Sequence, residues 1–285
     1  MILYMSFYSK GEQIKATSKI IMANNIGMLC GFITSTILYD LVGMKIICLF
    51  SLIAGLIGFG LSFSLESVKV STSAKIKVID LLKVATDKNL IIFSILALVQ
   101  QGVQMATTMS FTNQLITNLG ASNLLVGISS IIYMISAVLF AKLASTKLLM
   151  LLSIKNWIYI SFFALGLYCL LVPQANSVFL IYLLQIIPGM GTGILFSLLT
   201  SEALKNIDSQ KRSTAMGFYQ AVYAIGMTTL PIISGYLNES FSMQIAFSFL
   251  AGICFIAIFI AIVYFKISSK HKNKEPQVSS SKVNL

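Results

Sequence analysis

The stretch KRSTAMGFYQAVYAIGMTTLPIISGYLNES, residues 211–240, has a weaker second copy near the start of the chain. Shifted back by 199 positions, residues 214–239 align with residues 15–40, and seven of the 26 aligned pairs are identical. The apolar stretches that follow also match, FSLIAGL from Phe50 and FSFLAGI from Phe247, with the offset reduced to 197. Two successive segments therefore recur as a unit, and repeats of long apolar segments are typical of multi-span membrane proteins.

The composition is also that of a membrane protein. Of the 285 residues, 57% are hydrophobic and only 10% are charged, with a mean hydropathy of +0.89. These values exclude an ordinary soluble domain and make the lipid bilayer the expected environment. The net charge of +11 would suggest a nucleic-acid partner for a soluble protein. Here the basic residues lie between apolar segments, so we predict no such partner.

The residues that usually carry catalysis or bind metals are sparse. The four cysteines lie inside apolar segments without ligand spacing, so we expect neither disulfides nor a metal site. The sequence has no cluster of His, Cys and carboxylate residues and no phosphate-binding glycine loop. We therefore predict that the protein is not an enzyme and needs no cofactor.

Eight uncharged segments are long enough to cross a bilayer as helices, which takes about 20 residues. They comprise residues 20–41, 46–65, 89–141 as two spans divided by a polar turn at 118–123, 156–172, 177–200, 215–237 and 241–265. Two further tight turns are expected at residues 42–45 and 173–176. Residues 148–154 are predicted either as the first turns of the fifth span or as an interfacial approach to it.

Two polar segments flank the later spans. Residues 66–88 are predicted to contain an interfacial helix, because Ile76, Ile79, Leu82 and Val84 fall near one helical face. Residues 266–285 carry five lysines, Pro276 and several serines, which predicts a disordered basic tail.

The basic residues predict the orientation. Alternate placement of the loops collects 19 of the 20 Lys and Arg residues on one side of the membrane and leaves only Lys45 on the other. By the positive-inside rule, the crowded side is the cytoplasm. An even number of spans then places both termini in the cytoplasm.

The repeat relates the first span to the seventh and the second to the eighth, so the repeating unit is six spans long. Six is an even number, so both copies cross the membrane in the same direction. The first copy holds only two of its six spans in this chain. We therefore expect four preceding spans to be missing, supplied by another N-terminal segment.

At residues 9–266 the sequence resembles the major facilitator superfamily, matching its helices five to twelve. The resemblance implies an all-α membrane protein with eight transmembrane helices in a helical bundle. It assigns residues 1–65 to two spans of an N-terminal six-helix bundle, 66–88 to the cytoplasmic interdomain loop, 89–265 to a complete C-terminal six-helix bundle and 266–285 to the tail. It also implies alternating-access transport of a small organic solute across the cell membrane.

One family motif is only partly present. Drug antiporters of the family carry the pattern GxxxGPxxGG in helix five. Here residues 27–36 read GMLCGFITST, so Gly27 and Gly31 are kept but Phe32 replaces the proline. This departure weakens an antiporter assignment. Gly226 and Pro231 echo the pattern in the seventh span.

Polar side chains inside the spans predict which helices border a solute pathway, because they are costly in hydrocarbon. Gln100, Gln104 and Thr108 recur every four residues along the third span. Further candidates in the sixth and seventh spans are Gln185, Tyr219, Gln220 and Tyr223. Spans two, five and eight carry little beyond small hydroxyls, as expected of the peripheral helices in the family.

Each candidate has a second interpretation. Glutamines in membrane bundles also form hydrogen bonds between helices, and Tyr219 and Tyr223 equally suit core packing. Small residues and prolines are predicted to serve helix packing or gating. These are Gly27, Gly31, Pro188, Gly189, Gly226 and Pro231.

The middle of each span lacks ionisable residues. A lining of glutamine, threonine and tyrosine favours a neutral or amphipathic solute over an inorganic ion. The alternative function is that of a non-transporting membrane remnant or a partner-binding regulator on the same fold.

Overall fold

The computed structural model describes residues 12–64 and 83–272, and all regular secondary structure within these ranges is helical. The elements in chain order are α2 (Gln13–Ser62), η2 (Lys83–Thr86), α4 (Lys88–Ala106), η3 (Thr107–Phe111), α5 (Thr112–Asn118), α6 (Asn123–Ala144), η4 (Lys147–Leu151), α7 (Ile154–Leu171), η5 (Val172–Gln174), α8 (Val178–Leu184), α9 (Ile186–Met190), η6 (Gly191–Leu195), α10 (Phe196–Leu204), η7 (Ser209–Lys211), α11 (Arg212–Ser240) and α12 (Met243–Lys272).

Within the described residues, eight helical stretches are long and apolar enough to cross a membrane, which confirms the predicted number. They are Gln13–Tyr39, Leu41–Ser62, Lys88–Asn118, Asn123–Ala144, Ile154–Gln174, Val178–Leu204, Arg212–Ser240 and Met243–Ser269. The third span combines α4, η3 and α5, and the sixth combines α8, α9, η6 and α10. In both spans a π-helical turn, η3 or η6, interrupts the α-helix.

Glycines make the first two predicted turns. Gly43 has φ 72° and ψ 169°, which folds α2 back on itself between the first two spans. Gly120, in the turn after α5, has φ 81°. Positive φ is costly for residues with a Cβ atom, so these turns need glycine. The third predicted turn begins with the short 3-10 helix η5, which contains Pro173.

The approach to the fifth span is a separate element. The short helix η4 precedes α7, and Ser153 lies at the N-cap of α7 in an extended conformation. Residues 148–151 are therefore not the first turns of the span.

The predicted interfacial helix falls mostly on residues 65–82, which lie outside the described residues. The first element described after this gap is η2. Asp87 then caps α4 by accepting a hydrogen bond from the Leu90 amide at 2.8 Å.

The prediction of a disordered tail is wrong for residues 266–272, because α12 continues through them to Lys272. No proline or glycine interrupts the chain between Gly252 and Pro276, so the helix has no intrinsic stop where the charged residues begin. Residues 273–285 lie outside the described residues.

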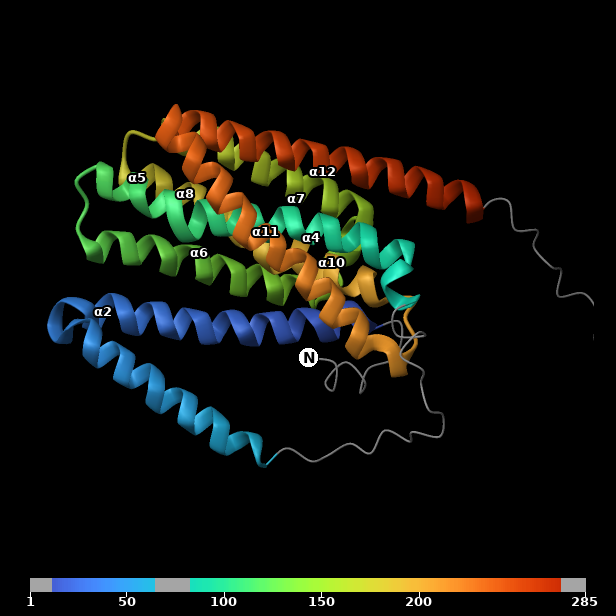
Figure 1. Ribbon diagram of the computed structural model, residues 1–285, viewed down its shortest axis with the longest axis horizontal. Helices are drawn as coiled ribbons and strands as arrows, with labels where there is room; N and C mark the ends of the chain where they lie inside the picture. Colours follow the sequence, from blue (N-terminus) through green and yellow to red (C-terminus); the bar gives the residue numbers. More distant parts are fainter. Residues whose placement is uncertain (1–11, 65–82, 273–285) are drawn as a thin grey trace, which may run out of the picture.

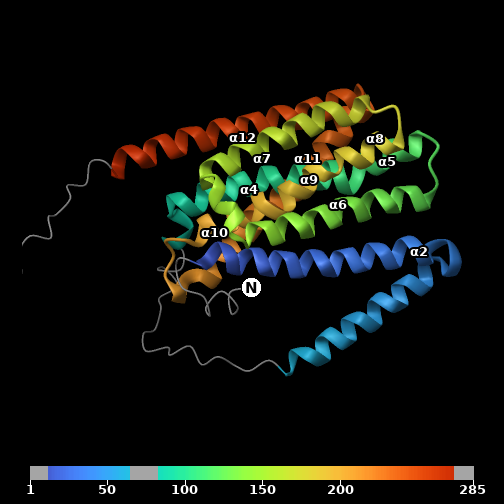
Figure 2. The same cartoon turned by 180° about the vertical axis from the view of Figure 1, so that it is seen from behind.

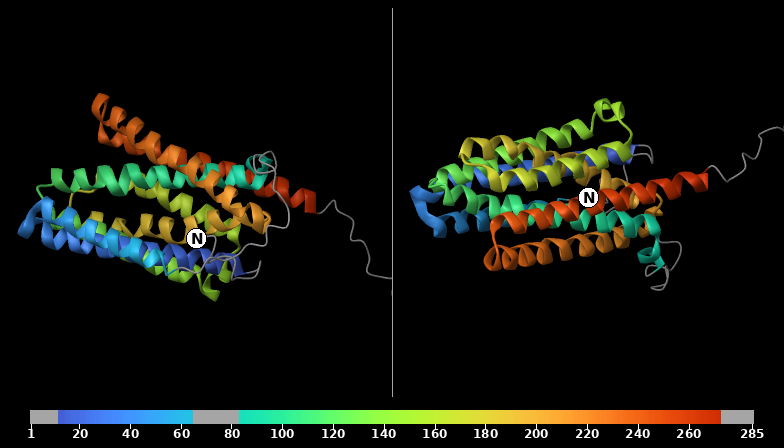
Figure 3. Two further views of the ribbon diagram at one scale, coloured as in Figure 1. Left: turned by 60° about the horizontal axis from the view of Figure 1, so that its bottom comes forward. Right: turned by 90° about the horizontal axis from the view of Figure 1, so that it is seen from above.

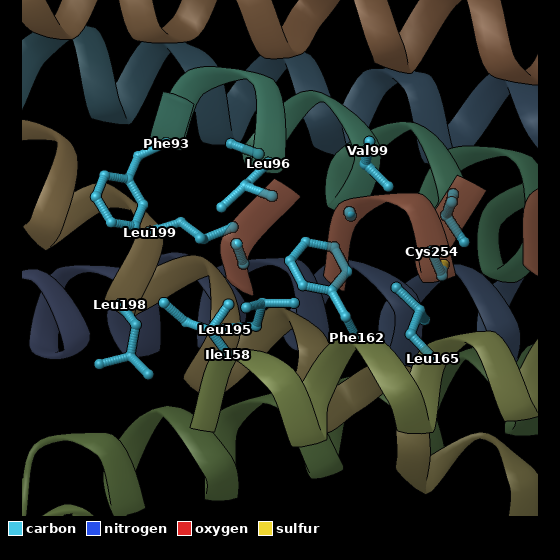
Figure 4. Close-up of a cluster of buried hydrophobic side chains, with 14 of the residues drawn as sticks. Phe93, Leu96, Val99, Ile158, Phe162, Leu165, Leu195, Leu198, Leu199 and Cys254 are labelled. Atoms are coloured by element: carbon cyan, nitrogen blue, oxygen red, sulfur yellow. The ribbon is translucent and has the colours of Figure 1, made fainter. Parts of the chain in front are cut away.

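A small apolar cluster contains Tyr133, Met134 and Ala137 of α6. Spans three to eight all contribute to a larger apolar core (Figure 1). Figure 4 shows its centre, where side chains from α4, α7, η6, α10 and α12 meet. The labelled residues are Phe93, Leu96, Val99, Ile158, Phe162, Leu165, Leu195, Leu198, Leu199 and Cys254. This core holds the helices that carry the polar candidates at fixed positions.

The two spans of α2 differ in their packing. The first lies along α6, and the second turns away from the bundle, as Figures 1 and 2 show. The views in Figure 3 show the same divergence from other directions. No residue of Leu41–Ser62 is buried, although the segment is strongly apolar. Its surface therefore faces lipid or a protein segment outside the described residues.

Helices α4 and α11 approach most closely where two glycines meet. A Cβ atom built on Gly226 would lie 2.2 Å from the carbonyl oxygen of Leu98. A Cβ atom on Gly102 would lie 2.6 Å from the carbonyl oxygen of Gly226. Small residues allow such close helix contacts, which provide van der Waals packing inside a membrane.

We expect Gly226→Ala to destabilise the protein by about 1–3 kcal/mol, because the added methyl group must force α4 and α11 apart. Gly217→Ala is the matched control on the same helix, since nothing lies within 4 Å of a Cβ atom there. Alanine is the better helix former, so the control should be neutral or stabilising by up to about 1 kcal/mol. Melting temperatures in detergent measure both effects. A Gly226→Ala protein as stable as Gly217→Ala would contradict the close crossing.

Candidate functional site

Four polar side chains from three spans form a hydrogen-bonded group that we call the inner polar cluster: Gln100, Gln104, Tyr133 and Thr192. Gln100 Nε2 donates to Gln104 Oε1 at 3.0 Å, and Gln104 Nε2 donates to the Tyr133 hydroxyl. The Thr192 hydroxyl lies 2.9 Å from Gln104 Oε1 and 2.8 Å from the Tyr133 hydroxyl. The side chain of Gln100 is 1% exposed and that of Gln104 7%, so the cluster is buried inside the bundle.

The two π turns lie beside this cluster. Gln104 comes just before η3, and Thr192 is the second residue of η6. In η3 the Thr107 hydroxyl donates to the Val103 carbonyl oxygen at 2.8 Å, a bond that competes with regular backbone pairing. Single π turns within α-helices are frequent at functional sites, because they reposition side chains locally.

A second polar cluster joins four spans: Thr112, Ser129, Tyr168 and Gln185. The Tyr168 hydroxyl lies 2.8 Å from Thr112 Oγ1 and donates to Gln185 Oε1 at 3.4 Å. Gln185 Nε2 donates to Ser129 Oγ at 2.9 Å. All four residues are buried. Gln185 therefore lies in a different hydrogen-bonded group from Gln100 and Gln104.

Of the remaining polar candidates, Thr108 lies beside Tyr168 of the second cluster, and the three on α11 lie apart from both clusters. Thr108 is buried, with its hydroxyl 3.5 Å from that of Thr107. On α11, Tyr219 is fully buried, accepts a hydrogen bond from Thr200 at 3.1 Å, and packs edge-on against Tyr223 at a ring distance of 5.5 Å. Tyr223 is half-buried and Gln220 is exposed.

The small-residue and proline candidates have different surroundings. A Cβ atom on Gly189 would lie 2.4 Å from Ser136 Oγ, so α9 approaches α6 closely there, as α11 approaches α4 at Gly226. In contrast, no atom lies within 4 Å of a Cβ atom built on Gly27 or Gly31. Pro188 is buried beside Gly189, and Pro231 lies within the continuous helix α11.

Sequence reasoning missed Tyr133 and Tyr168, each of which joins the members of one cluster. In the fourth span Ser129, Tyr133 and Ser136 recur at intervals of four and three residues, the same spacing that drew attention to the third span. Tyr168 comes from the fifth span, which was expected to contribute little polarity. That expectation is wrong, because the Tyr168 hydroxyl lies at the centre of the second cluster.

The chemistry of the inner polar cluster is that of neutral donors and acceptors. Gln100 Oε1 is buried and has no hydrogen-bond partner among the described residues, so it is an available acceptor. Neither cluster contains a charged side chain. The described residues also hold no group of three or more His, Cys, Asp or Glu side chains that could bind a metal ion. The arrangement suits recognition of an uncharged group by hydrogen bonds.

Comparison with known proteins identifies the family. The family model described as Major Facilitator Superfamily matches residues 93–284, about two thirds of the chain. A comparison with curated protein sequences gave no match. The match covers most of the third span and all of the later ones, including every residue of both polar clusters. This match and the eight apolar helices show that the chain belongs to the Major Facilitator Superfamily and is a multi-pass membrane transporter of the major facilitator type.

Proposed function

We propose that the protein moves a small organic solute by alternating access and that the inner polar cluster forms part of the solute pathway. The observation that carries the proposal is the buried, uncharged hydrogen-bonded group of Gln100, Gln104, Tyr133 and Thr192. Buried polar groups are costly in hydrocarbon unless they are paired. The unpaired Gln100 Oε1 therefore supports a role in binding, since a solute donor would satisfy it.

The solute class follows from the same side chains. Amides and hydroxyls offer donors and acceptors without a fixed charge, and apolar residues surround them. A charged solute would need an opposite charge to offset its loss of hydration. We therefore propose a neutral or amphipathic organic solute, with Thr108, Gln185, Tyr219, Gln220 and Tyr223 as further pathway candidates.

The complete transport unit in this proposal has twelve spans, of which this chain supplies eight. The internal repeat pairs Gly27 with Gly226, yet Gly226 packs against Leu98 and Gly27 has no close neighbour. By analogy with Gly226 and α4, the repeat predicts that another helix packs against Gly27. An N-terminal segment supplying four spans is the proposed partner.

The proposed location is the cell membrane with both termini in the cytoplasm, because 19 of the 20 Lys and Arg residues then lie on the cytoplasmic side. Reporter proteins fused after Lys88 and after Ser177 should report opposite sides of the membrane, with Lys88 cytoplasmic. Alkaline phosphatase and a fluorescent protein are complementary reporters for this measurement. Reports of the same side for both positions would contradict the topology.

The pathway role can be measured without knowledge of the solute. In a variant whose four native cysteines are replaced by serine, Gln100→Cys and Gln104→Cys should react with a small water-soluble thiol reagent. Leu96→Cys and Val103→Cys are matched controls on the same helix, because both native side chains belong to the apolar core and not to the polar cluster. These controls should stay unlabelled, as mass spectrometry can verify. Protection of both glutamine positions would instead assign the cluster to contacts between helices.

We expect the 285-residue chain alone, reconstituted in liposomes, to be helical and inserted but inactive toward a panel of labelled neutral and amphipathic solutes. Alternating access rocks one six-helix bundle against another around a site at their interface. Activity should appear when a segment supplying four preceding spans is fused or co-expressed. Saturable transport by the chain alone would contradict the twelve-span proposal. Inactivity of the combined unit would favour a non-transporting remnant or a partner-binding regulator.

A further inference from the structure

Two adjoining cavities open at the end of the bundle where α4 and α7 begin and α10 and α12 end. The first, which we call the apolar groove, has a volume of about 520 Å³ and lies between α4 and α12. Its walls are mainly Ile92, Phe259, Ile260, Val263 and Ile267. The second, which we call the basic cavity, has a volume of about 710 Å³. Asn89, Tyr264 and Ser268 line both cavities, so the two adjoin across these residues.

The basic cavity carries excess positive charge. Its charged lining consists of Lys155, Lys205, Lys266 and Glu202. Glu202 is engaged by Lys205, whose Nζ lies 3.1 and 3.2 Å from the two carboxylate oxygens. Lys155 and Lys266 have no ion-pair or hydrogen-bond partner within residues 12–64 and 83–272. Two ammonium groups are therefore available to an anion.

Other charges nearby do not cancel this excess. Lys88 lines the apolar groove and adds a third ammonium group close to the junction. Asp87 precedes it, but its carboxylate caps α4 through the Leu90 amide and lines neither cavity. The charge pattern thus complements a ligand with a negative head.

The wall between the two cavities is fixed by aromatic packing. The Tyr264 hydroxyl donates to Asn89 Oδ1, which ties α12 to α4. The Tyr264 ring packs edge-on against Phe93 at 5.3 Å and against Phe265 at 5.2 Å. Phe265 in turn packs against Tyr159 of α7 at 6.1 Å. These contacts hold the lysines and the groove in a constant relation, which lowers the ordering cost of binding.

The apolar groove is open toward the surroundings of the bundle. Phe259 is 67% exposed and Ile267 54%, so the α12 wall presents hydrocarbon outward. Figure 1 shows that α11 crosses α4 obliquely and diverges from α12 toward its own N-terminal end. It therefore leaves the groove uncovered. In a membrane, an acyl chain can enter the groove from the side.

We propose that the two cavities together bind one anionic phospholipid, with its phosphate near Lys155 and Lys266 and one acyl chain in the apolar groove. Basic pockets between transmembrane helices are suited to anionic headgroups, and the adjacent apolar walls suit the tail. A free phosphate would use only the basic cavity and would gain nothing from the groove. The two cavities adjoin, and a negative headgroup joined to an acyl chain would use both, which favours a lipid.

Native mass spectrometry of the purified full chain tests the site with phosphatidylglycerol and with phosphatidylcholine of the same acyl chains. Phosphatidylglycerol should bind more tightly. The double variant Lys155→Gln/Lys266→Gln should lose most of this preference, at roughly fivefold in affinity for each lysine near a membrane surface. The matched control is Lys142→Gln/Lys147→Gln, which makes the same charge change at the same end of the bundle. Neither control residue lines the apolar groove or the basic cavity, so the lipid preference of this variant should be unchanged.

A second pair of variants tests the groove. Val263→Trp fills the groove and should weaken phosphatidylglycerol binding, whereas Ile256→Trp places the same ring on exposed α12 surface outside it. Equal binding of the two lipids, or equal losses in the lysine variant and its control, would overturn the proposal. Competition by inorganic phosphate, together with full binding by Val263→Trp, would identify a soluble-anion site and also overturn it. The readout needs no transport, so it is independent of the proposed function.

Discussion

A polar group inside a hydrocarbon layer has no water to bond with, so the protein itself must satisfy it. This constraint links the third to sixth spans through the two polar clusters. Gln104 accepts from Gln100 and Thr192 and donates to Tyr133, and Gln185 bonds to partners on the fourth and fifth spans. Apolar contacts hold the helices together, but they carry little directional preference. A hydrogen-bonded amide fixes the relative height and rotation of the helices that share it.

The glycine contacts allow these bonds to form. A hydrogen bond between side chains requires their helices to approach closely, and the contacts of Gly189 and Gly193 with α6 provide that approach for the bonds between the fourth and sixth spans. The hydrogen bonds between these helices therefore depend on the small residues beside them. The repeat adds a contrast, since Gly27 has the same local sequence as Gly226 but no close neighbour. The same short motif therefore packs against another helix in the seventh span but not in the first.

The sequence was sufficient to predict the spans and turns, because both depend on local properties. The length of an uncharged segment decides whether it can cross a bilayer. The chain reversals need positive φ, which the glycines at positions 43 and 120 adopt without steric cost. The side-chain partners depended on tertiary structure. Spacing alone placed Gln104 and Thr108 in one stripe that Thr112 would extend, but η3 rotates the helix between them. Gln104 consequently bonds to Tyr133 on α6, and Thr112 bonds to Tyr168 on α7.

The π turns have a consequence for how this span can vary among related chains. A π turn contains one residue more than an α turn, and each residue of an α-helix advances the chain by about 100° of rotation. Loss of one residue from η3 would leave the hydropathy and length of the span almost unchanged. It would nevertheless swing Thr112 and the rest of α5 to a different side of the helix. An alignment that treats such a gap as neutral would therefore equate residues that face different neighbours.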